Sequence, residues 1–289
     1  MSEGLSSDSP ALRRLELAAA LRKHRRSARL TTLEVTEQLG FSASKLSRIE
    51  TGNRSVQPSD LDRMCLLYGV PDDERQRLSL LVDESRRSSS WRHIEAFDFD
   101  QVEFAELEQA ASAIDDYKTS IITSLLQTPA YTWAFLRVLK PQQPSDLIAE
   151  LVEGRILRQK AIFERPDPPR LHFIVDEAAI RRRVGDGATM RTQLEHLAAQ
   201  AANRRLTLQV IPFAAGAHPA MDSVFTILSF AHSVRDRVYV DDLQGNTYLT
   251  TPRDLERYRV TFARLREIAL NTNDSRSLLL ETAEFHDSA

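Results

Sequence analysis

Apolar positions recur at helical spacing through the first part of the chain. Leu12, Leu15, Ala18 and Leu21 repeat every three or four residues, which predicts a helix that continues to about Ser27. Similar spacing after it predicts four shorter helices, so we expect an all-α, five-helix domain over residues 11–84. The shorter helices are predicted from Thr32 to Gly40, from Ser42 to Gly52, from Pro58 to Tyr68 and from Asp72 to Glu84.

Capping signals mark the ends of the second and third predicted helices. Thr31 and Glu34 have the Ser/Thr-x-x-Glu spacing of a capping box, so the second helix should start at Thr32. Gly40 can adopt the left-handed conformation that ends this helix, and Ser42 is a suitable N-cap for the next one. Two short helices joined by so tight a turn predict a helix-turn-helix, whose second helix enters the major groove of DNA.

The third predicted helix has an outward row of small and basic side chains. Leu46 and Ile49 form an apolar i, i+3 pair, so the opposite side of the helix should face the DNA. Arg48 is the strongest candidate, because a guanidinium can donate two parallel hydrogen bonds to guanine O6 and N7. The predicted base-reading residues are Ala43, Ser44, Ser47 and Arg48.

Charge is distributed unevenly along the chain, whose net charge is −3. Residues 11–54 contain ten Lys and Arg against four Asp and Glu, an excess of +6, whereas residues 91–289 contain 23 against 28. Positive charge confined to one region suits phosphate contact, because counterion release from DNA needs cations only where the protein docks. The side chains predicted to contact phosphate are Thr32, Lys45, Asn53 and Arg54.

These residues resemble a known DNA-binding family. Leu30–Gly40 together with Ser42–Gly52 is similar to the repressor/Cro-like helix-turn-helix of the XRE family, most closely in the run SKLSRIETG. The resemblance implies a structural pair between an arginine of the first helix and the glutamate near the end of the third, here Arg25 and Glu50. The alternative is a helical bundle that contacts only other proteins.

A second, larger domain is predicted after the polar stretch Ser85–Ser90, which has the composition of a linker. Helical and strand patterns alternate over residues 91–289, which predicts an α+β domain. Helices are expected over residues 101–112, 129–139, 145–163, 190–202 and 252–270, and strands over residues 171–175, 206–211, 224–230 and 237–240, with Gly245 and Asn246 as a turn between Tyr239 and Tyr248.

The second region also carries a resemblance. It is similar to the C-terminal domain of actinobacterial XRE-type regulators described as antitoxin-like, through the runs LLQTPAY, RPDPPRLHFIVDEAAIRRRVG, LQVIPFAAGAHPAMDSVFTIL and VYVDDLQGNTYL. The resemblance implies a small partner protein and a role in gene control. Ile121–Leu126 departs from the Val-Pro-Gly-Leu-Leu run that the family commonly has at this point.

Motifs of enzymes are missing from the sequence. It has no P-loop, no dinucleotide-binding glycine run, no nucleophile elbow and no His or Cys at metal-ligand spacing. We therefore expect no catalytic residues, no metal and no cofactor. Without an apolar run of membrane-spanning length or a secretory signal, we expect a cytoplasmic, nucleoid-associated protein with a disordered tail over residues 1–10.

Aromatic and apolar residues of the second domain could line a pocket for an effector, although such residues are more often part of a core. His218 is of interest because it lies in a loop, in the run GAHPA between two apolar strands. The predicted pocket residues are Tyr131, Trp133, Phe173, Phe213, His218, Met221 and Phe225.

These patterns together favour a sequence-specific transcription regulator. We expect a homodimer on a palindromic operator, with the second domain used for dimerisation and for a small protein partner or small-molecule effector. One alternative is an antitoxin-like module that binds a small protein encoded nearby, with DNA binding for autoregulation. Another is an enzyme with an attached DNA-binding domain, which would need acidic side chains gathered around His218.

Overall fold

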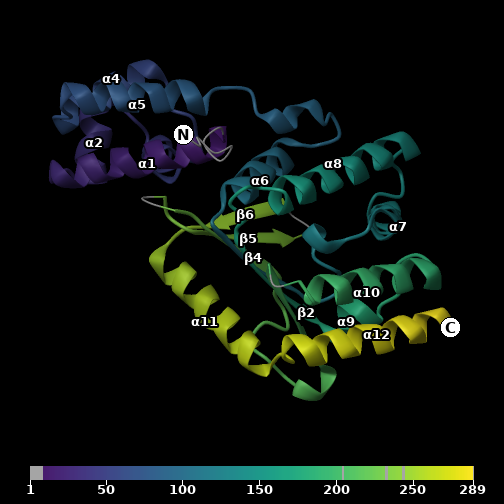
Figure 1. The fold of residues 1–289 in the computed structure, drawn as a ribbon. Coiled ribbons are helices and arrows are strands. Elements are labelled where there is room, and N and C mark those ends of the chain that lie inside the picture. Colours follow the sequence, from purple (N-terminus) through teal and green to yellow (C-terminus); the bar gives the residue numbers. More distant parts are fainter. Residues whose placement is uncertain (1–8, 204, 232–233, 243–244, 289) are drawn as a thin grey trace. The chain divides into compact units, whose positions relative to one another are not determined.

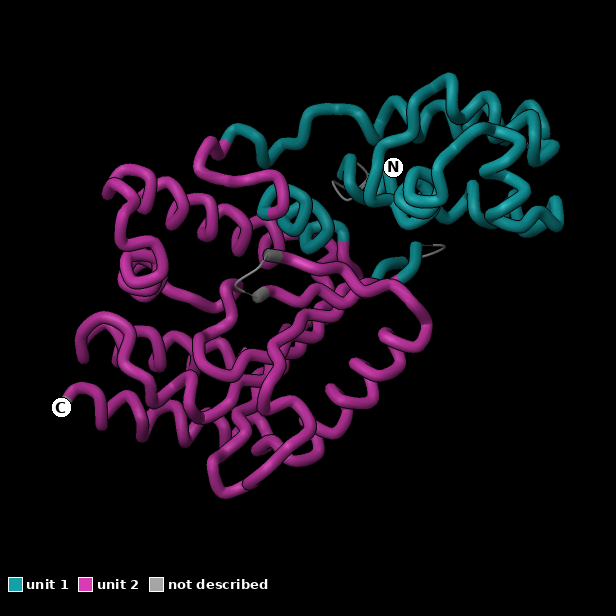
Figure 2. The backbone as a smooth tube through the Cα atoms, turned by 180° about the vertical axis from the view of Figure 1, so that it is seen from behind, with its two compact units in different colours: residues 1–93, 101–110, 230–235 teal, residues 94–100, 111–229, 236–289 magenta. Residues whose placement is uncertain are grey.

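The computed structural model describes residues 9–203, 205–231, 234–242 and 245–288, and Figure 1 shows the elements they form. Contacts divide the chain into two units, coloured separately in Figure 2. The first unit runs to His93 and also contains Gln101–Ala110 and Phe230–Arg235, and the second contains the other described residues. Residues 1–8 of the predicted tail lie outside the described residues, whereas Ser9 caps the first helix and Pro10 begins it.

Local sequence explains the helices of the first unit. The capping box predicted for Thr31 and Glu34 is present, with both reciprocal hydrogen bonds. Gly40 and Gly52 end their helices with φ angles of 64° and 74°, a left-handed conformation that glycine adopts without strain. These helices are α1 (Pro10–Ser27), α2 (Thr32–Leu39), α3 (Ala43–Thr51), α4 (Pro58–Tyr68) and α5 (Asp72–Ser85).

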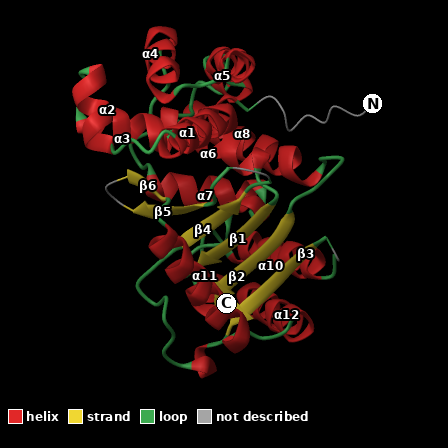
Figure 3. Cartoon of the chain, turned by 90° about the vertical axis from the view of Figure 1, so that its left-hand side faces the viewer, coloured by secondary structure: helices red, strands yellow, loops and turns green. Residues whose placement is uncertain are grey.

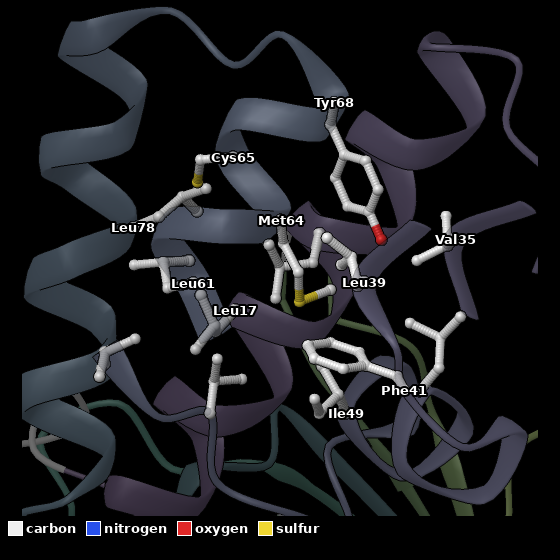
Figure 4. Close-up of a cluster of buried hydrophobic side chains, with 14 of the residues drawn as sticks. Leu17, Val35, Leu39, Phe41, Ile49, Leu61, Met64, Cys65, Tyr68 and Leu78 are labelled. Atoms are coloured by element: carbon white, nitrogen blue, oxygen red, sulfur yellow. The ribbon is translucent and has the colours of Figure 1, made fainter. Parts of the chain in front are cut away.

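An apolar cluster holds these helices together (Figure 4). Leu17, Ile49 and Met64, from three different helices, are each at most 1% exposed. Burying a side chain of this size stabilises the fold by about 1.5–3 kcal/mol. Cys65 belongs to the same cluster, and burial raises the pKa of its thiol to about 11, so the thiol stays protonated at neutral pH.

A helix from beyond the predicted linker completes the first unit. Glu106 of α6 (Phe99–Ala110) accepts a 2.8 Å hydrogen bond from the backbone N–H of Ala11, and Glu103 forms an ion pair with Arg14. A carboxylate here satisfies a free N–H group at the start of α1 and interacts favourably with the helix dipole. The contacts therefore differ from the predicted division at Ser85–Ser90, because the N-terminal end of α1 finds its partners on a helix after that segment.

The second unit is a mixed α/β domain whose described residues form a six-stranded sheet (Figure 3). The strand order is β3-β2-β1-β4-β5-β6, with β1, β2 and β3 parallel and the other neighbours antiparallel. The strands are β1 (Ala113–Lys118), β2 (Arg170–Asp176), β3 (Leu206–Ile211), β4 (Phe225–Ser229), β5 (Arg237–Asp242) and β6 (Gly245–Leu249).

The two faces of this sheet bury different side chains. Tyr117, Ile174 and Phe225 are direct partners across three strands, so they share the face on which α11 (Pro252–Ile268) packs. Phe173 precedes Ile174 in β2 and therefore points to the opposite face. The other helices of this unit are α7 (Pro129–Leu139), α8 (Ser145–Phe163), α9 (Glu177–Arg181), α10 (Gly187–Ala201) and α12 (Thr272–Ser288).

The sequence pattern does not predict β1 or α12, and it misplaces one turn. β1 escapes prediction because two successive carboxylates, Asp115 and Asp116, interrupt its apolar alternation. Tyr239 and Tyr248 do pair, but Gly245 and Asn246 belong to β6 and not to the turn. No described helix is long and apolar enough to span a bilayer.

Candidate DNA interface

The outward face of α3 is fixed by its caps and by the side chains that it buries. The Ser42 hydroxyl accepts a 3.1 Å hydrogen bond from the backbone N–H of Lys45, and Gly52 ends the helix. Leu46 and Ile49 are each 1% exposed. The predicted base-reading residues are all exposed on the other side, namely Ala43, Ser44, Ser47 and Arg48.

Arg48 is available for an external partner. Its guanidinium makes no ion pair or hydrogen bond with any residue that the structure describes. An uncommitted guanidinium keeps all five of its N–H donors and can bind two acceptors of one base edge at once. The neighbouring helical turn is stabilised separately, because the Thr51 hydroxyl donates to the Ser47 carbonyl at 2.9 Å.

The predicted phosphate contacts divide into two kinds. Thr32 at the start of α2, and Asn53 and Arg54 after α3, are exposed. Lys45 differs, since its ammonium lies 2.8 Å from an Asp60 carboxylate oxygen and 3.8 Å from the centre of the Phe41 ring. A phosphate that contacts Lys45 would have to compete with Asp60.

A buried ion pair connects α3 to α1. The Arg25 guanidinium donates to both carboxylate oxygens of Glu50, at 2.6 and 2.9 Å, which is the pairing that the family resemblance implied. It also donates to the Leu30 carbonyl at 2.8 Å, and Arg22 donates to the backbone oxygen of Glu50. Glu50 is 6% exposed, and its hydrogen bond raises the pKa of Arg25. The pair therefore fixes the end of α3 against α1 and against the turn at Leu30 that follows α1.

Basic side chains line a cavity of about 390 Å³ in the first unit. Burial lowers the pKa of Arg22, and the nearby positive charge of Arg235 lowers it further. Among the described residues, no acidic side chain lines the cavity, so its lining favours anions. The pattern along α1 did not indicate Arg235, which comes from the distant segment Phe230–Arg235. The lining residues are Ala19, Arg22, Lys23, Arg26, Ser27 and Arg235.

Comparison with protein families gives two matches. A family described as a helix-turn-helix domain matches residues 16–78, and one described as a domain of unknown function (DUF5753) matches residues 101–281, more than half of the chain. The chain belongs to the DUF5753 family. Its N-terminal region is a helix-turn-helix domain of the kind found in DNA-binding regulators. Neither the curated proteins nor the solved structures give a match.

The aromatic pocket predicted within the DUF5753 region is not one site. Phe173 and Phe225 are buried on opposite faces of the sheet, because strand residues alternate in direction. Phe213 and Met221 are exposed, at 58% and 63%. Tyr131, whose hydroxyl lies 3.3 Å from the Ile122 backbone N–H, is buried in α7. The same helix carries Trp133, which is 38% exposed.

His218, the remaining predicted pocket residue, lies in a small polar cluster that the sequence did not reveal. Its Nε2 lies 3.5 Å from the Tyr117 hydroxyl and 3.4 Å from an Asp176 carboxylate oxygen. Asp176 also caps α9, so the cluster has a structural role. Among the described residues, no group of three or more His, Cys, Asp or Glu side chains could hold a metal ion.

Proposed function

We propose that this chain is a sequence-specific transcription regulator that reads the major groove of DNA with the helix from Ser42 to Thr51. The observation that carries the proposal is the exposed row of four polar or small side chains that ends in Arg48, on a helix-turn-helix domain. Its orientation is fixed by the buried pair of Arg25 and Glu50. We infer that Arg48 recognises a guanine, a contact worth about 1–3 kcal/mol of discrimination.

The finer assignment rests on the family resemblances. We propose a repressor/Cro-like, five-helix domain of the XRE type, joined to an antitoxin-like actinobacterial C-terminal domain. Because two-fold operators match two-fold proteins, we propose a homodimer on a palindromic site, with dimer contacts from the DUF5753 region. The chain would act by occluding a promoter or recruiting polymerase, and would have no enzyme activity of its own.

A second candidate is the antitoxin-like function, in which the DUF5753 region binds a small protein. Exposed apolar side chains on α7 favour it, since Val138 is 79% exposed and Leu139 54%. DNA binding would then be autoregulatory. Co-expression with any small protein encoded beside this chain tests this function, because a stable one-to-one complex that Val138→Asp abolishes would support it.

Selection of binding sites from random duplex DNA tests the leading proposal. The full chain should enrich a palindromic motif that contains a guanine in each half-site, and Arg48→Ala should lose preference at that base. Arg86→Ala is the matched control, because Arg86 is an exposed arginine at the end of α5, outside the predicted interface. Failure of the wild-type chain to enrich any motif would overturn the proposal, as would an unchanged motif in the Arg48 variant.

A further inference from the structure

A polar cavity of about 460 Å³ opens in the DUF5753 region, apart from the residues proposed to contact DNA. It lies at the N-terminal ends of the parallel strands β1, β2 and β3, beside the connection from α11 to α12. This volume falls in the range of about 300–1,000 Å³ that is usual for sites of small molecules. The lining residues are Asp115, Arg170, His172, Thr207, Gln209, Arg266, Asn271 and Thr272.

Strand register explains why polar side chains meet here. Asp115, His172 and Thr207 are direct partners across β1, β2 and β3, so they share one face of the sheet. Tyr117 and Ile174 lie two residues further along on the same face, where the apolar core under α11 begins. The face therefore changes from apolar to polar toward the strand starts, and the cavity forms beyond the edge of the core.

His172 has an unused hydrogen-bond acceptor. The side chain is 4% exposed, and its Nε2 lies 2.8 Å from Gln209 Oε1. Gln209 Nε2 donates to the Leu270 carbonyl at 2.9 Å, which fixes the amide so that Oε1 must accept from the ring. His172 Nε2 therefore carries the hydrogen, and Nδ1 keeps a lone pair that no described residue engages.

The ring of His172 is neutral at physiological pH. Its pKa is lowered mainly by burial, and the positive charge of nearby Arg266 lowers it further, although the hydrogen bond with Gln209 opposes this. A neutral ring with hydrogen on Nε2 can accept at Nδ1 but cannot donate there. A hydroxyl or N–H group of a ligand would satisfy it.

Positive charge in the cavity comes from Arg266. Arg170 is compensated by a bidentate pair with Asp115, at 2.7 and 2.9 Å. Arg266 is exposed on α11 and makes no ion pair with the described residues. The 17-residue helix α12 begins at Thr272, so its N-terminal N–H groups add partial positive charge at the cavity. Asp274 offsets part of that charge: its carboxylate accepts from the Asn271 amide, and its backbone N–H already donates to Asn271 Oδ1 at 3.0 Å.

We propose that this cavity binds a small organic anion that also carries a hydroxyl or N–H group. Arg266 and the start of α12 contact the anionic group, and His172 Nδ1 accepts the hydrogen bond from the hydroxyl or N–H. The Gln209 amide connects His172 to the α11–α12 connection, so a bound anion also stabilises that connection. The site does not depend on DNA binding and is assayed without DNA.

NMR spectra of the histidine rings, recorded on the full chain with isotope-labelled histidine, test the proposal. L-malate and succinate are matched probes, since they carry the same charge and differ by one hydroxyl, and glycerol 3-phosphate tests a phosphate in place of a carboxylate. At least one hydroxylated probe should shift the His172 signal saturably. Where L-malate binds, it should bind about tenfold more tightly than succinate, because only its hydroxyl can donate a hydrogen bond to Nδ1.

Paired arginine variants on α11 separate the site from general charge effects. Arg266→Gln should weaken binding at least tenfold, whereas Arg264→Gln should leave it unchanged, because Arg264 is exposed on the same helix but does not line the cavity. Equal losses in the two variants would overturn the proposal. So would the lack of a saturable His172 shift with both hydroxylated probes, since the folded state of the chain is verified in the same spectra.

Discussion

Removal of the Glu50 carboxylate should loosen the DNA-reading helix from the rest of its domain. In Glu50→Ala, the Arg25 guanidinium loses two hydrogen bonds, at 2.6 and 2.9 Å, and retains the one to the Leu30 carbonyl. The Arg25 side chain is only 11% exposed, so water can replace little of the lost interaction. Breaking a buried pair from one side costs about 3–5 kcal/mol, because a buried charge is left without compensation.

Hydrogen exchange of the full chain, followed by mass spectrometry, measures this effect locally. A cost of about 3 kcal/mol corresponds to roughly a 100-fold rise in the exchange rate of peptides that cover α3. Glu50→Gln should lie between wild type and Glu50→Ala, because the amide oxygen still accepts one hydrogen bond. The double variant Arg25→Met with Glu50→Leu should recover most of the protection, since it buries no unpaired charge.

An exposed ion pair provides the control. Arg75 and Asp62 lie 2.8 Å apart, but their side chains are 47% and 57% exposed. Asp62→Ala should therefore change exchange by less than about threefold. If Glu50→Ala exchanged no faster in α3 than Asp62→Ala, the reasoning that the buried pair fixes this helix would be refuted.

Three further expectations concern the same unit. For DNA binding, a plot of the logarithm of the association constant against the logarithm of salt concentration should become shallower by about 0.9 in Arg54→Gln, which removes one phosphate contact. Lys45→Gln should change the slope by less, because the lysine is already paired with Asp60. Gly40→Ala should lower the free energy of unfolding by about 1 kcal/mol, measured by denaturant titration, since the space is open but φ is 64°. Cys65 should react with iodoacetamide only slowly at pH 8 in the folded chain, and rapidly after unfolding. Its raised pKa favours the folded state below about pH 8.5, and that contribution is lost as the pH rises toward 11.

The helix-turn-helix was predictable because its information is local. The capping box at Thr31 and the two glycines that end α2 and α3 are short-range signals, and each acts as expected. Glu106 could not be found in this way. Its carboxylate accepts a hydrogen bond from the backbone N–H of Ala11 at the start of α1, 95 positions earlier in the sequence. A single carboxylate in a later helix does not indicate so distant a partner.

The central strand shows a different limit of sequence reasoning. Asp116 is 3% exposed in β1, where its carboxylate accepts from the Thr226 hydroxyl and lies 3.2 Å from the Lys118 ammonium. A carboxylate usually indicates an exposed residue. Asp116 can be buried because Thr226 and Lys118 satisfy it, and the sequence does not show that Thr226, 110 positions away, is a partner. The strand is therefore hard to predict. The predicted pocket residues are spread over both faces of the sheet and its surroundings for a related reason, since sequence does not show which face of a sheet each strand residue joins.

The length of α3 explains why so many interactions converge on it. A helix of nine residues is marginal by itself, because few hydrogen bonds offset the cost of nucleation. Ser42 and Gly52 cap its two ends, Leu46 and Ile49 bury one side, and Glu50 joins its last turn to α1. None of these five residues belongs to the exposed row that ends in Arg48. Orientation and base reading therefore depend on different side chains, so a substitution in the exposed row can change the preferred DNA sequence while the position of the helix is kept.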